Sequence, residues 1–194
     1  MVGLAPLAGA DPVTLPALLP GDVLIVRTTG GWWARLIGRL IRFGAATRDQ
    51  PNMDDHVAIV HHVDPAGTLW VIEGRPGGVG WASAQQYDNP YLLHNAEQPK
   101  TQDQRDEVCA LAVGLLGTPY DWSAIVADGM AAIGAGTLWR SKDFGDGPPA
   151  HVVCSSLAAW LYHRVSLAEP DTTRRVTTPG DWADWVLRRG WQPR

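Results

Sequence analysis

Runs of apolar, β-branched residues in the first half of the chain predict β-strands. The run over 23–26 follows the turn sequence Pro-Gly-Asp at 20–22 and is typical of a buried strand. The runs over 55–63 and 68–73 are separated by the turn sequence Asp-Pro-Ala-Gly, which predicts a hairpin. Shorter strands are expected over 79–82, after a glycine-rich turn at 74–80, and over 91–94.

The second half of the chain has apolar residues at helical spacing. Thr101 and Gln104 fit a capping box, which predicts a helix that continues to about Leu116. A second helix is expected over 154–165, and a third over 178–189, with a proline at its favoured first position. Further helical patterns cover 32–43 and 122–138.

The pattern over 32–43 is amphipathic, with Arg35, Arg39 and Arg42 opposite the apolar stripe. Such a basic face is either simply solvated or lies on a membrane or a partner protein.

The order of these elements predicts the fold class. Because strands cluster in the first half and helices in the second, we expect an α+β fold. Prolines recur over 1–19, which we interpret as an N-terminal arm. We expect a single domain over 20–194, since no repeat or linker divides it.

Composition narrows the partners and the location. A formal net charge of −4 gives no basis for nucleic-acid binding. No apolar run reaches the roughly 18 residues that span a bilayer, so no integral membrane segment is expected. The N-terminus has no Lys or Arg before Arg27, so we expect no signal peptide and synthesis in the cytoplasm with reduced thiols. Association with a phage particle, or release by lysis, would leave no such signal.

Cys154 is the first candidate for chemistry, because it stands immediately before an apolar run of helical spacing. A thiolate is a far better nucleophile than a thiol, and a helix N-terminus or a nearby histidine lowers the pKa of a thiol. The other cysteine, Cys109, lies within a helical pattern and is interpreted as a buried structural thiol. Cys154 is therefore either a nucleophile or a core residue, depending on whether a base is close to it.

His56 is the preferred base among the six histidines. It begins a strand of small and β-branched residues, which would hold its ring on rigid structure. Counting outward from the turn at Pro65 places Glu73 roughly opposite residues 57–59, within a register slip of His56. Glu73 would then orient the imidazole, the third role in a nucleophile–base–orienter set. His151 is less favoured as the base because it lies in the loop that approaches the cysteine.

Five segments follow one another along the chain in a characteristic order. They are Pro20–Leu24, His56–Val60, the strand that ends in Glu73, Gly117–Asp121 and Cys154–Leu157. This order resembles that of the circularly permuted papain-like cysteine hydrolases of the NlpC superfamily, in particular the YiiX-like branch. In ordinary papain-like enzymes the cysteine precedes the histidine, whereas here the histidine comes first. The resemblance covers residues 20 to 189 and implies a papain-like fold, with a small antiparallel sheet packed on helices.

The resemblance also implies an activity, that of a cysteine peptidase or amidase without a cofactor. Cys154 would attack an amide or ester carbonyl, His56 would act as general base and then general acid, and Glu73 would orient His56. The expected substrate-binding residues are Tyr120, Asp55 and Ser155. The commonest substrates in the superfamily are peptide bonds of bacterial peptidoglycan, while permuted members include lipid acyl hydrolases and acyltransferases.

Two features depart from the family pattern. The YiiX-like branch has Cys-Ser-Glu-Leu where this chain has Cys-Ser-Ser-Leu, so Ser156 replaces an acidic residue. The segment 123–149, between the Tyr-Asp motif and the cysteine, is a long insertion that leaves the substrate open.

Three other interpretations stay open. A catalytically silent papain-like module of a phage particle would bind other virion proteins. A lipid acyl hydrolase or acyltransferase would show an apolar trough beside Cys154, formed by the helix over 32–43. A metal site built from His151, Cys154 and His163 has no familiar zinc spacing, so we expect no metal.

Overall fold

A computed structural model of the chain describes residues 18–27, 56–87, 93–124, 147–170 and 177–191. These residues form a mixed α and β structure with a four-stranded antiparallel sheet. The strands are β1 (Val23–Val26), β2 (His56–Val63), β3 (Leu69–Arg75) and β4 (Gly78–Ser83). The helices are the 3₁₀ helix η1 (Ala84–Gln86) and the α-helices α2 (Gln102–Gly114), α4 (Cys154–Arg164) and α5 (Pro179–Arg188). The expected succession of strands and then helices is confirmed.

The sheet is a meander in which every strand pairs with its neighbour in the chain, in the order β1-β2-β3-β4. The predicted hairpin is present as β2 and β3, with Ile59 opposite Ile72 and a shift of register between Val60 and His62. The predicted strand over 79–82 is present as β4, which begins at Gly78. The predicted turn over 74–80 is shorter than expected: residues 74 and 75 belong to β3, and the chain reverses at 76–77. Gly78 follows with a φ of +102° that favours glycine.

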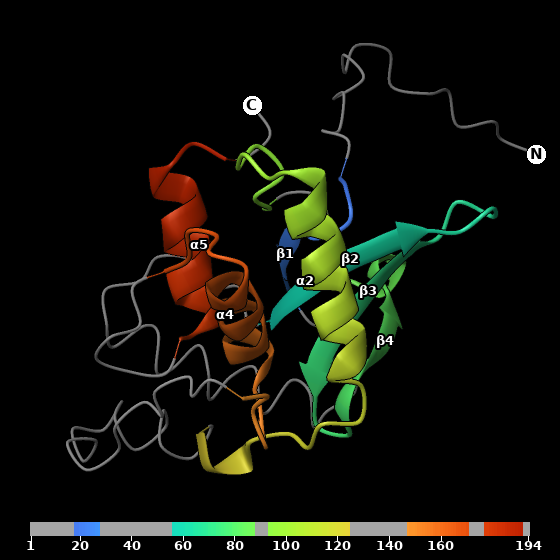
Figure 1. Ribbon diagram of the computed structural model, residues 1–194, viewed down its shortest axis with the longest axis vertical. Helices are drawn as coiled ribbons and strands as arrows, with labels where there is room; N and C mark the ends of the chain where they lie inside the picture. Colours follow the sequence, from blue (N-terminus) through green and yellow to red (C-terminus); the bar gives the residue numbers. More distant parts are fainter. Residues whose placement is uncertain (1–17, 28–55, 88–92, 125–146, 171–176, 192–194) are drawn as a thin grey trace, which may run out of the picture.

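The three α-helices lie against one face of the sheet, with α4 between α2 and α5 (Figure 1). Side chains alternate between the two faces of a strand, so adjacent residues of β2 enter different clusters. Val57 and Ile59 pack with Leu157 and Trp182 in the core beneath the helices. Neighbouring Ala58 belongs to a second apolar cluster, which also contains Leu24, Val26, Val60, Leu69, Val71 and Tyr87. The sheet is thus apolar on both faces.

The Pro-Gly-Asp turn ties the start of β1 to α2. Asp22 is fully buried, and its Oδ1 accepts from Lys100 Nζ and from Arg105 Nη1, each at 2.8 Å. Gly21 has a φ of +84°, and a Cβ there would stand 3.2 Å from the Cα of Arg105. Glycine is required because the turn is left-handed and packs directly on the helix backbone.

The predicted helices agree with the structure where it describes them. Thr101 and Thr178 each form a capping box at the start of a helix, and α5 has Pro179 at its first position. The strand predicted over 91–94 is described only at residues 93 and 94, where His94 forms an isolated antiparallel bridge with Leu24 instead of a strand. The predicted helix over 32–43, most of that over 122–138 and most of the arm over 1–19 lie outside the described residues. Within the part of the chain that is described, every helix is too short or too polar to cross a bilayer.

Candidate active site

Cys154 is the first residue of α4, as expected from the sequence. The preceding residue, Val153, has extended backbone angles (φ −100°, ψ 167°) and carries no side-chain acceptor for the first turn. The N–H groups of a first helical turn have no partner within the helix and carry the positive end of the helix dipole. The thiol of Cys154 therefore lies at the N-terminus of α4, the end of a helix that favours negative charge.

Ser156 closes the start of α4 with its side chain. Its Oγ accepts from the backbone N–H of Val153 at 3.0 Å, which is the contact that an N3 glutamate makes in a capping box. The hydroxyl also donates to the carbonyl oxygen of Val153 at 3.1 Å. The start of α4 is thus closed by a neutral side chain.

Gly74 lets the start of α4 approach β3. A Cβ at this position would lie 3.1 Å from the backbone nitrogen of Cys154 and 3.2 Å from the carbonyl carbon of Val153. Contacts this close to backbone atoms leave no room for a side chain. The residue after Glu73 is therefore the point where the sheet and the cysteine helix meet.

His56 and Glu73 form a buried pair across β2 and β3. The Nε2 atom of His56 lies 2.6 Å from Oε2 of Glu73, and the two residues are 8% and 3% exposed. With Ile59 opposite Ile72, Glu73 comes next to Ala58 and reaches His56 diagonally along the same face. This is the register that the sequence predicts. Because Nε2 faces the carboxylate, Nδ1 is the ring nitrogen that remains for Cys154.

The charge state of His56 links all three side chains. Burial by itself lowers the pKa of the imidazole, because it disfavours the charged form. The charges of Cys154 and Glu73, and hydrogen bonds to both, outweigh this effect and hold the pKa well above the usual value of 6.5. These contacts favour the protonated, positively charged form of the His56 ring.

Tyr87 is a member of the site that the sequence analysis missed. Its hydroxyl donates to the same Glu73 oxygen that faces His56, and its ring lies 5.7 Å from the His56 ring, centroid to centroid. Tyr87 follows η1 directly and is 8% exposed. A single tyrosine after a short 3₁₀ turn carries no periodic signal, so only the folded sheet brings it to Glu73.

The three expected substrate-binding residues differ in where they lie. Tyr120 is 8% exposed. Burial raises the pKa of its phenol, and the charge of Cys154 raises it further. Ser155 is 1% exposed and donates to the carbonyl oxygen of Thr177 at 2.6 Å, so its hydroxyl anchors α4 within the fold. Its predicted contact with substrate stays untested. Asp55 lies outside the described residues.

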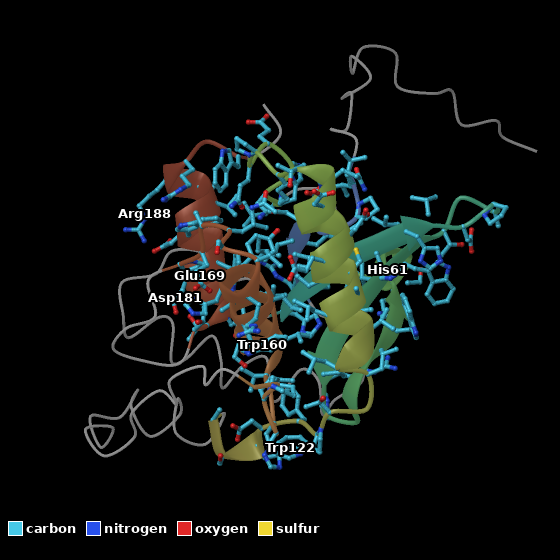
Figure 2. The ribbon with its side chains drawn as sticks, viewed as in Figure 1. His61, Trp122, Trp160, Glu169, Asp181 and Arg188 are labelled. Atoms are coloured by element: carbon cyan, nitrogen blue, oxygen red, sulfur yellow. The ribbon has the colours of Figure 1, made fainter. Side chains whose placement is uncertain are left out.

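The Tyr-Asp motif is joined to the segment that leads into α4. Tyr120 forms a parallel bridge with Val152, two residues before Cys154. The ring of Trp122 packs edge-on against Tyr120 at 5.3 Å and is 49% exposed. Figure 2 shows Trp122 at the end of the molecule where the chain leads into α4. An exposed tryptophan therefore stands beside Tyr120, whose pKa the charge of Cys154 affects.

The competing thiol and histidines lie elsewhere. Cys109 is buried in α2, and burial raises its pKa to about 11, which fits a structural thiol. Both cysteines are free, so they form no disulfide. His151 is exposed, and His163 Nδ1 lies 3.1 Å from Oε1 of Glu169. Among the described residues, no three His, Cys, Asp or Glu side chains gather as metal ligands.

No protein-family model matches the sequence, and a search of curated proteins finds no match. The candidate site therefore rests on its own geometry and on the resemblance in chain order.

Proposed function

We propose that this protein is a cysteine-dependent hydrolase of amide or ester bonds, with Cys154 as nucleophile, His56 as base and Glu73 as orienting carboxylate. The observation that carries the proposal is the buried His56 ring. Its Nε2 contacts Glu73 at 2.6 Å, and the charges of Cys154 and Glu73 outweigh burial and raise its pKa. A core cysteine would not need a paired, buried histidine beside it.

The chemistry follows from these positions. The thiolate of Cys154 adds to the substrate carbonyl carbon, and the carbonyl electrons move to oxygen. N–H groups of the first turn of α4 stabilise this oxyanion. The carbonyl then re-forms, the bond to the leaving group breaks, and His56 gives its proton to that group. A water molecule, deprotonated by His56, attacks the resulting thioester, and the thiolate leaves while the acid product is released.

The order histidine, glutamate, cysteine supports a circularly permuted papain-like arrangement of the NlpC type, and with it a substrate class. We propose a peptide bond of bacterial peptidoglycan as the bond that is cut. The exposed Trp122 beside Tyr120 supplies an apolar surface at the approach to the cysteine, which suits a substrate that extends beyond the scissile bond.

The test is incubation of the purified protein with muropeptides and, separately, with phospholipid vesicles, followed by mass spectrometry. We expect a shortened peptide with the wild-type protein and none with Cys154→Ala. Cys109→Ala is the matched control, because it removes the other thiol and should leave product formation intact.

Two outcomes would change the proposal. A fatty-acid product from phospholipid, lost in Cys154→Ala, would replace the peptidoglycan substrate by an acyl lipid. Absence of product from both substrates, with a folded protein, would favour the catalytically silent binding module over a hydrolase.

A further inference from the structure

We infer that Tyr87 is a positioning residue of this site, which holds the Glu73 carboxylate against the His56 ring. The inference rests on the proposed function, because a positioning role needs a reaction to serve. It concerns a residue that neither the chain order nor any motif indicates.

The contacts of Glu73 Oε2 carry the inference. This one oxygen accepts from the Tyr87 hydroxyl and also lies 2.6 Å from Nε2 of His56. The rings of Tyr87 and His56 are tilted by 39° with centroids 5.7 Å apart, so both side chains close over the same carboxylate. The backbone N–H of Tyr87 donates to the carbonyl oxygen of Ala84 at 3.2 Å, which fixes the tyrosine at the end of η1.

Arg75 is a second cationic group toward which the Glu73 carboxylate could rotate. Arg75 Nη1 lies 3.8 Å from Oε1 of Glu73, and the arginine side chain is 47% exposed. This distance is too long for a hydrogen bond, but a rotation of the carboxylate would shorten it. Without the Tyr87 hydroxyl, the carboxylate would be drawn from His56 toward Arg75. Tyr87 thus keeps Oε2 on the imidazole, and the imidazolium in turn stabilises the thiolate.

The charged and titratable groups around His56 come from three elements. Glu73 of β3 contacts the ring, Cys154 of α4 acts on it by charge and hydrogen bonding, and Tyr87 packs against it. Arg75 and Tyr120 act one step away, through Glu73 and Cys154. A pH profile of the cysteine therefore reports on this set as a unit.

The experiment is the rate of alkylation of Cys154 by iodoacetamide between pH 5 and 9, with Cys109 as an internal reference in the same peptide map. The thiolate displaces iodide and forms a thioether, so the rate follows the thiolate population. In Tyr87→Phe we expect the rate at a given pH on the acid limb of the profile to fall by about three- to tenfold, a fraction of what a hydrogen bond to a charged group contributes. The acid limb of the profile should move up by about 0.5 to 1 pH unit.

A double-mutant cycle separates positioning from a general loss of structure. If Tyr87 acts through Glu73, Tyr87→Phe should have no further effect in the Glu73→Gln background. Tyr162→Phe is the matched control, because it removes a buried hydroxyl that donates to Gly21 at 2.6 Å, away from the site. This control should lower the melting temperature without moving the profile.

The outcomes distinguish the two proposals. If wild-type Cys154 reacts no faster than Cys109, the proposed function fails and the role of Tyr87 fails with it. If Cys154 is reactive but Tyr87→Phe leaves the profile unchanged, or shifts it equally in the Glu73→Gln background, only the role of Tyr87 is overturned.

Should Tyr87→Phe not fold, NMR of the wild-type protein tests the role of Tyr87 instead. A slowly exchanging Tyr87 hydroxyl proton with a cross-peak to His56 is expected, and a rapidly exchanging one would overturn the inference.

Discussion

Three nearly inaccessible side chains form the candidate site: His56, Glu73 and Cys154 are 8%, 3% and 2% exposed. A carboxylate and an imidazole removed from water are costly unless they pair, and here each satisfies the other at 2.6 Å. The same burial keeps water from weakening the charge interactions with Cys154. At the residue scale, the pairing that stabilises these two buried groups is also the one that would prepare the thiol for attack in the proposed reaction.

The raised pKa of His56 predicts a pH dependence of stability. Burial lowers this pKa, but the charges of Cys154 and Glu73 hold it well above 6.5 in the folded protein. The folded state therefore binds the proton more tightly than the unfolded chain, where histidine titrates near about 6.5. The resulting stabilisation is complete below that pH and is lost as the pH rises through the folded pKa. In urea unfolding, the gap between the wild type and His56→Gln should be widest at about pH 6 and narrow toward pH 9.

His94 supplies a control, because its pKa is shifted in the opposite direction to that of His56. Its ring is fully buried, and burial lowers its pKa, with the charges of Asp22 and Glu97 offsetting part of that effect. The folded state then binds the proton less tightly, so stability declines as the pH falls below about 6.5. The gap between the wild type and His94→Gln should narrow toward acid. A gap for His56→Gln that also narrows toward acid would contradict the ion pair.

At the scale of elements, the close contact of β3 with the start of α4 decides where the cysteine lies relative to the glutamate. Glu73 and Gly74 are adjacent, yet one supplies a side chain to His56 while the other supplies the space that Cys154 occupies. The alternation of side chains along a strand makes this possible, because successive residues face opposite sides.

Gly74→Ala tests this contact. The added methyl group would stand 3.1 Å from the nitrogen and 3.3 Å from the Cα of Cys154, so α4 has to move away from β3. We expect a loss of about 1–3 kcal/mol in the free energy of unfolding, as for other overpacked sites. Alkylation of Cys154 should slow at neutral pH, because a displaced helix no longer presents the thiol to His56.

Gly114→Ala is the matched control in α2, where a new Cβ meets nothing within 4 Å. Because alanine is the better helix former by about 0.5–1 kcal/mol, this variant should be neutral or slightly more stable. It should leave the alkylation rate unchanged. An unchanged alkylation rate in Gly74→Ala would mean that the close approach does not set the position of Cys154.

At the scale of the whole molecule, Asp22 joins the start of β1 to the start of α2. Its carboxylate is fully buried with Lys100 and Arg105, whose side chains are 0% and 8% exposed. Replacement by asparagine would leave two buried cations without their counter-charge. We expect Asp22→Asn to lower the free energy of unfolding by about 3–5 kcal/mol, as measured by urea denaturation.

The exposed ion pair of Asp184 and Arg188 is the control for the buried Asp22 cluster. Asp184 lies 3.8 Å from Arg188 one turn along α5, and the arginine side chain is 76% exposed. Asp184→Asn should cost no more than about 1 kcal/mol. Equal losses in the two variants would show that the Asp22 cluster does not hold the molecule together.

Local patterns account for what the sequence predicted correctly. Alternating and β-branched runs indicated the strands, and capping residues such as Thr101 and Thr178 indicated where helices begin. The turn at Pro65 allowed the register of Glu73 to be counted, because a short hairpin leaves little freedom in pairing. The strand over 79–82 was predicted correctly, but the turn before it was predicted too long, since glycine permits both a strand that another backbone approaches and a reversal of the chain.

The sequence by itself determined the elements, the hairpin register and the candidates Cys154, His56 and Glu73, because each depends on residues close together along the chain. Only the tertiary structure decided that Tyr87 donates to Glu73, that Gly74 admits the start of α4, and that Asp22 gathers Lys100 and Arg105. The contacts of Gly74 and Asp22 join segments that are far apart in sequence, and Tyr87, only 14 residues from Glu73, reaches it after a 3₁₀ turn that no pattern indicates. These contacts form when the sheet and helices pack together. A periodic pattern of apolar residues does not show which polar groups that packing will place in contact.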